Sequence, residues 1–167
     1  MSGPTATRRA AFLDRDGVLV RSLIRDGKAL APTHFGEFAI LPGAAEAAKL
    51  LRAEGYLLIL ASNQPDVGNG LVAREEVERM NSALDAEIGL DAIKVCFHGQ
   101  QEGCACRKPA PGMLIEAARD LAIELGASYM VGDRRTDVEA GHAAGCRTVF
   151  IDRGYDLPQA VLPDFTP

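Results

Sequence analysis

Two carboxylates, Asp14 and Asp16, stand two positions apart at the end of a short apolar run and are followed by Gly17. Residues at i and i+2 of an extended segment point to the same side of the chain, so both acids can face one reacting group. The glycine lets the backbone turn sharply after them. Such a pair could supply a nucleophile beside a proton donor. The alternative is an acidic turn that merely closes a strand, and the rest of the chain must decide between the two.

Further polar groups follow other apolar runs. Ser62-Asn63-Gln64 comes after the run at 56–61, and Gly132-Asp133 comes after the run at 129–131, with Asp137 four residues on. In open parallel sheets, ligands bind beyond the carboxyl ends of the strands. Three polar groups at the same edge of one sheet are hard to attribute to turn chemistry alone, and they favour an active site.

The acidic residues of this group indicate a metal ion. Three carboxylates at one edge repel one another unless a cation is present, and the oxygens of Asp14 and Asp133 are hard ligands that suit magnesium. Magnesium in turn suggests a phosphate substrate. The hydroxyl of Ser62 could hold phosphoryl oxygens, and Lys108 could supply the positive charge that a phosphoryl transition state requires.

Three cysteines and one histidine cluster ahead of this lysine: Cys96, His98, Cys104 and Cys106. Three thiolates and one imidazole fit a closed tetrahedral zinc site, although the spacing is not the common Cys-x-x-Cys. Incidental thiols or a redox pair are the alternatives. With four protein ligands the zinc would be structural and would stiffen the loop that leads into Arg107-Lys108-Pro109. Cys146 is expected to be a buried apolar thiol.

The periodicity of apolar residues predicts strands that alternate with helices. Strands are expected at 10–13, 56–61, 93–97, 129–131 and 147–151, and helices at 44–54, 74–88, 113–125 and 136–145. Thr136 and Glu139 fit a capping box that opens the last helix. This alternation predicts an α/β fold with a doubly wound, Rossmann-like parallel sheet. Segment 21–40 has no clear period, and we expect it to shape the mouth of a pocket.

Length and composition place the chain among ordinary globular proteins. It has 167 residues, of which 47% are hydrophobic and 25% charged. We expect one domain at 10–156, a flexible lead-in at 1–9 and an irregular tail at 157–167. A net charge of −5 argues against nucleic acid or an anionic membrane as partner. No apolar run approaches the roughly 20 residues of a membrane span. A cytoplasmic monomer is expected. His142 is expected to be structural, whereas His34, in the segment near the pocket mouth, could contact substrate.

The ordered motifs resemble those of the haloacid dehalogenase superfamily of phosphatases. They are Asp14-Arg15-Asp16-Gly17, Ser62-Asn63-Gln64, Arg107-Lys108-Pro109, and Gly132-Asp133 through Asp137. The cysteine and histidine set ahead of Arg107 narrows the resemblance to the zinc-containing branch of that superfamily. The match runs from about residue 10 to residue 151. No insertion is long enough for a large cap domain, so short loops must exclude water and select the substrate.

The resemblance implies a role for each motif residue. Asp14 would take the phosphoryl group as an aspartyl-phosphate, and Asp16 would protonate the leaving alkoxide and then activate water. Ser62 and Lys108 would stabilise the transferring group. Magnesium would be held by Asp14, the backbone carbonyl of Asp16, and Asp133. Substrate contacts are expected from Ser22, Arg25, Asn63 and Arg107. Asp137 and Arg134 could contribute to the metal or phosphate site, or Asp137 could serve only its helix.

Members of this branch act on more than one substrate. Segments 63–70 and 110–113 resemble enzymes that remove the 7-phosphate of D-glycero-D-manno-heptose 1,7-bisphosphate, which is our first expectation. The gap of five residues between His98 and Cys104 is short and resembles histidinol-phosphate phosphatases. A zinc-stabilised binding module without catalysis is an alternative from another class. An end-phosphatase for polynucleotides is disfavoured by the acidic charge and the lack of a basic aromatic stripe.

Overall fold

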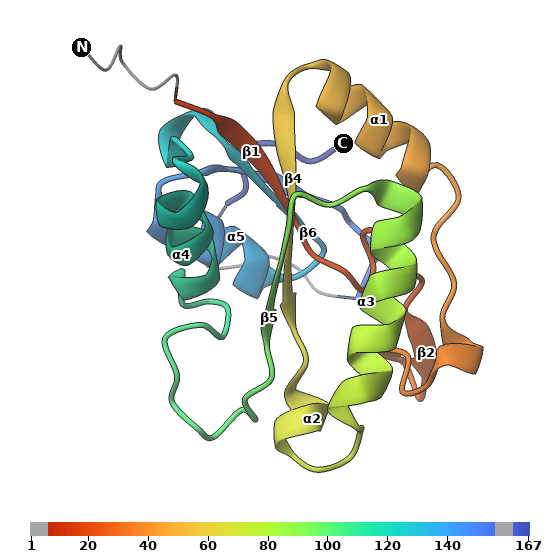
Figure 1. Ribbon diagram of the computed structural model, residues 1–167. Coiled ribbons are helices and arrows are strands. Elements are labelled where there is room, and N and C mark those ends of the chain that lie inside the picture. Colours follow the sequence, from red (N-terminus) through yellow and green to blue (C-terminus); the bar gives the residue numbers. More distant parts are fainter. Residues whose placement is uncertain (1–6, 156–161) are drawn as a thin grey trace.

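The computed structural model describes residues 7–155 and 162–167, and its centre is a parallel sheet of five strands (Figure 1). The strand order is β5-β4-β1-β6-β7, and all four pairings are parallel. The strands are β1 Arg9–Leu13, β4 Tyr56–Asn63, β5 Ala92–Cys96, β6 Tyr129–Gly132 and β7 Arg147–Phe150. The chain leaves β1 toward β4 and β5, and later returns to the other side for β6 and β7. The end of β1 therefore lies at the topological switch point, where the order of successive strands reverses. Ligands of open α/β sheets usually bind at this position.

Helices cover both faces of this sheet (Figure 1). On one face lie α1 Ala44–Ala53 and α3 Arg74–Ile88, and on the other lie α4 Gly112–Leu121 and α5 Arg135–Ala144. This arrangement confirms the doubly wound α/β fold that the alternation of strands and helices predicted.

Successive side chains of each central strand enter two separate cores. In β1, Ala10 and Phe12 pack against α4, whereas Ala11 and Leu13 pack on the side of α1 and α3. Side chains of a strand point alternately to the two faces of a sheet. The apolar runs of β1 and β4 are continuous because both faces of the sheet are buried.

The segment without clear periodicity contains short elements at the carboxyl edge of the sheet. Strands β2 Leu23–Arg25 and β3 Lys28–Leu30 form an antiparallel hairpin, followed by the 3-10 turn η1 Phe35–Glu37. A short helix, α2 Pro65–Gly68, follows β4. Elements of three or four residues are too short to show a period. Within the described ranges no larger insertion forms a cap domain, as expected.

Two helix boundaries differ from the sequence prediction. The helix expected to reach residue 125 ends at Leu121, because Ala122 adopts a left-handed conformation with φ of 53°, and the 3-10 turn η2 Leu125–Ala127 follows. The capping box predicted from Thr136 is wrong. Helix α5 begins at Arg135, and the backbone N–H of Arg134 donates to the Asp137 carboxylate at 3.0 Å.

Residues 1–6 of the expected lead-in, residue 156 at the end of the expected domain and residues 157–161 of the expected tail lie outside the described residues. Arg9 already belongs to β1. Phe165 extends the sheet at its edge, since its backbone N–H donates to the Thr148 carbonyl at 3.0 Å and its carbonyl accepts from Phe150 at 2.9 Å. The domain boundaries stay predictions. No described helix is both long and apolar enough to cross a membrane.

Candidate active site and metal centre

Three buried carboxylates meet at the carboxyl edge of the sheet. Asp14 follows β1, Asp133 follows the neighbouring β6, and Asp137 lies in the first turn of α5. Each offers an oxygen, and these oxygens all lie within 4.8 Å of one another. The sheet pairing of β1 with β6 brings together residues that are more than a hundred positions apart in the sequence.

Lys108 ties two of these acids together from a buried position. Its Nζ lies 3.0 Å from Oδ1 of Asp14 and 2.6 Å from Oδ1 of Asp137, and it donates to the Ala61 carbonyl at 2.7 Å. Burial alone would lower the pKa of Lys108, but the two carboxylates outweigh it and raise the pKa above its ordinary value. The amide of Asn63 both donates to and accepts from the backbone of Lys108, at 3.0 Å each. The lysine is therefore a fixed cation.

Asp133 has one engaged oxygen and one unengaged oxygen. Its Oδ2 accepts a hydrogen bond from the hydroxyl of Tyr155, whereas Oδ1 is buried without a hydrogen-bond partner among the described residues. Burial, together with the charge of Asp14, raises the pKa of Asp133 to about 8. The same causes raise the pKa of Asp137 to about 6. Excess negative charge and an unpartnered hard oxygen fit a divalent cation such as magnesium.

Two glycines allow this close packing. Gly17 has φ of +87°, and a Cβ there would lie 1.8 Å from Oδ2 of Asp133. A Cβ at Gly132 would lie 2.1 Å from the side chain of Asp137. Real Cβ contacts are never this short, so a larger residue at either position would displace a carboxylate of the site.

Asp16 belongs to a second hydrogen-bond network beside the first. Its Oδ1 accepts from Nε of Arg15 at 3.1 Å, and its Oδ2 accepts from Nε2 of Gln64 at 2.8 Å. The same Gln64 nitrogen donates to the hydroxyl of Ser62 at 2.8 Å. Burial and the charge of Asp14 raise the pKa of Asp16, while Arg15 opposes the shift. The protonated form that an acid catalyst needs is thereby favoured.

Some site residues were not assigned a role from the sequence. Arg15 is fully buried and reaches Oδ1 of Asn81 on α3 at 3.1 Å, so the helix helps to hold Asp16. Asn81 is a polar residue on the buried face of α3, which is a signal the sequence did offer. Gln64 is the last residue of the Ser62-Asn63-Gln64 motif, but only Ser62 and Asn63 were given roles. Tyr155 follows the last strand and belongs to no motif.

A cavity of about 400 Å³ opens above these groups. Of the expected substrate contacts, Ser22, Asn63 and Arg107 line it, as does Arg134. Nη1 of Arg107 is buried and has no hydrogen-bond partner among the described residues, which suits an anionic ligand. The structure does not bring Arg25 to this cavity.

The other expected positions lie as follows. The guanidinium of Arg25 pairs with Glu37 at 2.5 Å, and most of its side chain is exposed. Ser62 is fully buried at the end of β4 and reaches the site through Gln64. Nε2 of His142 lies 3.1 Å from Oγ1 of Thr148 in β7, and Nε2 of His34 lies 3.6 Å from Oε1 of Glu37. Neither histidine lines the cavity.

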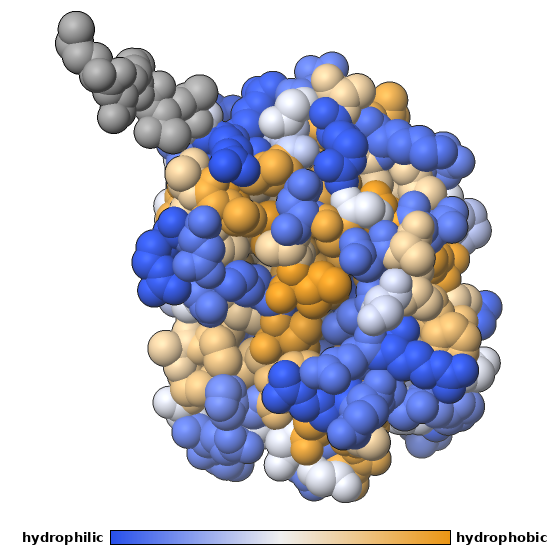
Figure 2. Space-filling model, in the orientation of Figure 1, coloured by the Kyte–Doolittle hydropathy of each residue, from blue (hydrophilic) through white to orange (hydrophobic). Residues whose placement is uncertain are grey.

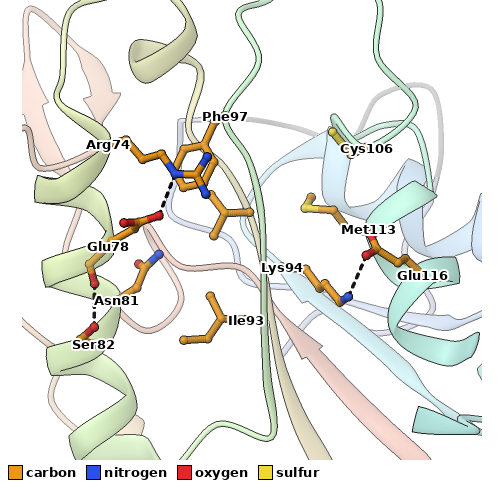
Figure 3. Close-up of a pocket in the computed structure, with 11 residues that line it drawn as sticks. Arg74, Glu78, Asn81, Ser82, Ile93, Lys94, Phe97, Cys106, Met113 and Glu116 are labelled. Carbon is orange, nitrogen blue, oxygen red and sulfur yellow. Dashed lines mark hydrogen bonds and ion pairs between the residues drawn. The ribbon is translucent and has the colours of Figure 1, made fainter. Parts of the chain in front are cut away.

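A second cavity, of about 480 Å³, lies over the edge strand β5 between α3 and α4 (Figure 3). Its charged side chains pair with each other: Arg74 with Glu78 at 2.7 Å, and Lys94 with Glu116 at 3.1 Å. Figure 2 shows apolar surface in the middle of this side of the molecule. Ile93, which lines the cavity, is partly exposed (Figure 3). No residue of the carboxylate cluster lines this cavity, so chemistry rather than size identifies the candidate active site.

The cysteine cluster forms as the sequence predicted. Sγ of Cys106 lies 3.1 Å from Sγ of Cys96, 3.5 Å from Sγ of Cys104 and 3.2 Å from Nδ1 of His98. The four donor atoms all lie within 4.8 Å of one another, and three thiols with one imidazole are a donor set that suits tetrahedral zinc. Cys146 is buried in the same apolar core but does not belong to this group of four donors.

The electrostatics of the cluster favour a thiolate. Burial would raise the pKa of Cys104, but hydrogen bonds from the backbone of Arg107 and from neighbouring thiols lower it to about 7. Burial, helped by the other thiols, raises the pKa of Cys106 to about 12. The cluster thus favours ionisation of one thiol over the others, and the charge of a bound metal ion would favour ionisation of all three.

Comparison with known proteins gives concordant results. A model of the HAD-hydrolase-like family matches residues 105–167. The chain is 37% identical to the D-glycero-beta-D-manno-heptose-1,7-bisphosphate 7-phosphatase of Haemophilus ducreyi, over 87% of this chain and 84% of the relative. It is 33% identical to the D-glycero-alpha-D-manno-heptose-1,7-bisphosphate 7-phosphatase of Burkholderia mallei, over 86% of this chain and 79% of the relative.

A solved structure agrees with these sequence relatives. The D,D-heptose 1,7-bisphosphate phosphatase of B. bronchiseptica, crystallised with magnesium and phosphate, superposes with a TM-score of 0.81 at 32% identity. The match covers 96% of this chain and 92% of that one. The likeness therefore extends over the whole sheet and the loops at its carboxyl edge.

Proposed function

We propose that this chain, which belongs to the heptose-bisphosphate phosphatase family of the haloacid dehalogenase-like hydrolases, removes the 7-phosphate of D-glycero-D-manno-heptose 1,7-bisphosphate with the help of magnesium. The observation that carries the proposal is the buried set of Asp14, Lys108 and the unpartnered Oδ1 of Asp133 beneath a small cavity. A nucleophile, a fixed cation and a free metal ligand are the parts that phosphoryl transfer needs.

Asp14 is the proposed nucleophile. The contacts that the described residues make with its carboxylate both fall on Oδ1, from the backbone N–H of Arg15 at 2.8 Å and from Lys108 at 3.0 Å. Oδ2 remains to attack phosphorus. A bond then forms between Oδ2 and phosphorus while the bond from phosphorus to the ester oxygen breaks, and Lys108 offsets charge on the transferring group.

Asp16 is the proposed proton shuttle. In its protonated form it would give its proton to the departing alkoxide, and the resulting carboxylate would take a proton from the water that hydrolyses the aspartyl-phosphate. Gln64 and Arg15 hold this carboxyl from two sides. Because both groups donate, they hold the ionised carboxylate in place for its step as a base.

The metal ions have separate roles. Asp14, Asp133 and the backbone carbonyl of Asp16 would hold magnesium, which supplies positive charge beside the phosphoryl oxygens. The four cysteine and histidine ligands would hold zinc as a structural ion. The backbone N–H of Gly112 donates to the Ala105 carbonyl at 3.1 Å, so the zinc loop is fastened on both sides of Lys108. Zinc would thereby fix the lysine.

A compact sugar bisphosphate suits the rest of the cavity. Arg107 and Arg134 both line it and could pair with the phosphate that is not removed. Without a large cap, access is limited by the β2–β3 hairpin and α2. A cytoplasmic location is part of the proposal, since three thiols kept as metal ligands require a reducing compartment. We also propose a monomer, in keeping with the acidic net charge.

Phosphate release from a panel of substrates tests the substrate. The panel holds both anomers of heptose 1,7-bisphosphate, histidinol phosphate and simple hexose phosphates. We expect one heptose anomer to exceed histidinol phosphate in kcat/KM by at least about tenfold, which corresponds to about 1.4 kcal/mol in the transition state. A tenfold preference for histidinol phosphate would overturn the substrate assignment. Absence of release from every substrate would favour the binding-module alternative.

A further inference from the structure

Tyr155 lies against the carboxylate cluster, although it is 22 residues beyond Asp133 and follows the last strand of the sheet. Its hydroxyl donates to Oδ2 of Asp133 and also contacts the hydroxyl of Ser22. A phenol hydroxyl has one proton to donate, and here it points to a carboxylate oxygen, which when ionised can only accept.

The hydrogen bond divides the two oxygens of Asp133 between two tasks. Oδ2 is occupied by the tyrosine, whereas Oδ1 is buried and unpartnered among the described residues. A free carboxylate can rotate and offer either oxygen, but a carboxylate held at one oxygen presents the other in a fixed direction. The contact therefore leaves Oδ1 as the oxygen available to a metal ion.

Two further contacts hold the tyrosine where it is. Nε of Arg153 donates to the carbonyl of Gly17 at 2.9 Å, which fastens this segment to the turn after the two acids. The guanidinium of Arg134 lies over the ring of Tyr155, 4.9 Å from its centre. A Cβ at Gly17 would lie 2.5 Å from the Tyr155 hydroxyl, so glycine is needed for this approach.

We infer that Tyr155 is a positioning residue of the magnesium site: its hydroxyl orients Asp133 toward the metal, and its ring supports Arg134 at the edge of the cavity. The inference rests on the proposed function for the identity of the metal. Groups that hydrogen-bond a metal ligand from outside contribute about 10- to 100-fold to metal affinity or activity. The tyrosine would thus act on catalysis through metal binding, without touching the reacting atoms.

The test is the magnesium affinity of a Tyr155→Phe variant. This change removes the hydroxyl and keeps the ring beneath Arg134. Magnesium is titrated calorimetrically, without substrate, into the zinc-containing protein prepared without added magnesium. We expect the Kd for magnesium to rise at least about tenfold. Tyr129→Phe is the matched control. The hydroxyl of Tyr129 accepts from Arg147 at 3.3 Å, and Tyr129 begins β6, at the opposite end of the strand from Asp133. The magnesium Kd of this control variant should not change.

Activity measurements separate positioning from general damage. With saturating magnesium, Tyr155→Phe should regain the kcat of the unaltered protein to within about threefold, because the chemical groups are intact. Tyr155→Ala, which also removes the ring, should additionally raise the KM for substrate. A magnesium Kd for Tyr155→Phe within twofold of the unaltered protein, or tighter than it, would overturn the inference. Since binding is measured without substrate, this result is distinct from a failure of the unaltered protein to release phosphate.

Discussion

Lys108 and Asp137 form a buried ion pair whose members need each other. The ammonium lies 2.6 Å from one oxygen of Asp137, and both side chains are almost inaccessible to solvent. Asp137 itself has no place in the proposed transfer of the phosphoryl group. The geometry instead gives it the task of holding the lysine against Asp14, in addition to accepting from the backbone of Arg134. One carboxylate thus serves both the helix start and the site.

Replacing Lys108 with methionine is therefore expected to lower both activity and stability. Loss of the cation beside the phosphoryl group should reduce kcat by about 10²- to 10³-fold. The carboxylate left buried without its partner should cost about 3–5 kcal/mol in unfolding free energy. Phosphate release and denaturant unfolding measure the two effects.

Lys94→Met is the matched control for that variant. Lys94 pairs with Glu116 and Asp120 on the surface of the second cavity. Exposed ion pairs contribute about 0–1 kcal/mol, so this variant should keep full activity and nearly full stability. Equal losses of activity in both lysine variants would contradict the assigned role of Lys108.

The raised pKa values of Asp133 and Asp137 predict a pH-dependent effect of magnesium on stability. In the unfolded chain these carboxyls have the ordinary pKa of 3.8, whereas in the metal-free fold their pKa values are about 8 and about 6. At pH values between the ordinary pKa and these raised values, the folded state binds more protons than the unfolded state. The contribution of these groups to stability therefore falls as pH rises. Magnesium would replace the proton on Asp133 and oppose the raised pKa of the neighbouring Asp137, so its stabilising effect should grow with pH.

Thermal unfolding with and without magnesium measures this effect. We expect the increase in Tm caused by magnesium to be larger at pH 8 than at pH 5.5, where the carboxyls are largely protonated. An Asp133→Asn variant should lose most of the difference. A magnesium effect that is equal at both pH values would show that Asp133 does not hold the ion.

At the scale of elements, regular periodicity made the main helices and strands predictable. Helix α3 begins and ends at the residues expected, because its apolar side chains recur at helical spacing between Ala73 and Gly89. The β2–β3 hairpin was not predicted, since strands of three residues show no period. The early end of α4 at Leu121 depends on the left-handed conformation of Ala122, which its residue type does not favour.

The site was predictable where short motifs carry the chemistry. Asp14, Lys108 and Asp133 meet because each stands at or near the carboxyl edge that a parallel sheet creates. Arg25 and Tyr155 show which contacts of the site cannot be predicted from the sequence. Whether Arg25 turns toward the cavity or toward Glu37 depends on the hairpin, and the approach of Tyr155 depends on a contact between distant segments, which no local pattern encodes.

The zinc loop gives a prediction at the same scale. A Cys104→Ser variant should lose bound zinc and, with it, the order of the loop that ends at Lys108. A loss of a few kcal/mol would lower Tm by roughly 10 °C in a chain of this size. Cys146→Ser is the control, since that thiol lies in the core and should leave the zinc content unchanged. Metal analysis and thermal unfolding report the outcome, and full zinc content in Cys104→Ser would contradict the ligand set.

For the whole molecule, the order of the strands explains why one small domain suffices for the proposed chemistry. The order of successive strands reverses at β1, so loops from both halves of the sheet converge on Asp14. Two separate apolar cores hold the sheet rigid from both faces. The cost of burying three carboxylates at its edge is offset by Lys108 and, in the proposal, by magnesium.

The central claim is that Asp14 attacks the phosphate, and an Asp14→Asn variant tests it most directly. The amide fills the same space but is a poor nucleophile, so phosphate release from heptose 1,7-bisphosphate should fall by at least about 10³-fold. The variant should remain folded and retain zinc. An Asp120→Asn variant, altered at an exposed carboxylate, should keep its activity. Phosphate release by Asp14→Asn within tenfold of the unaltered protein would contradict the account.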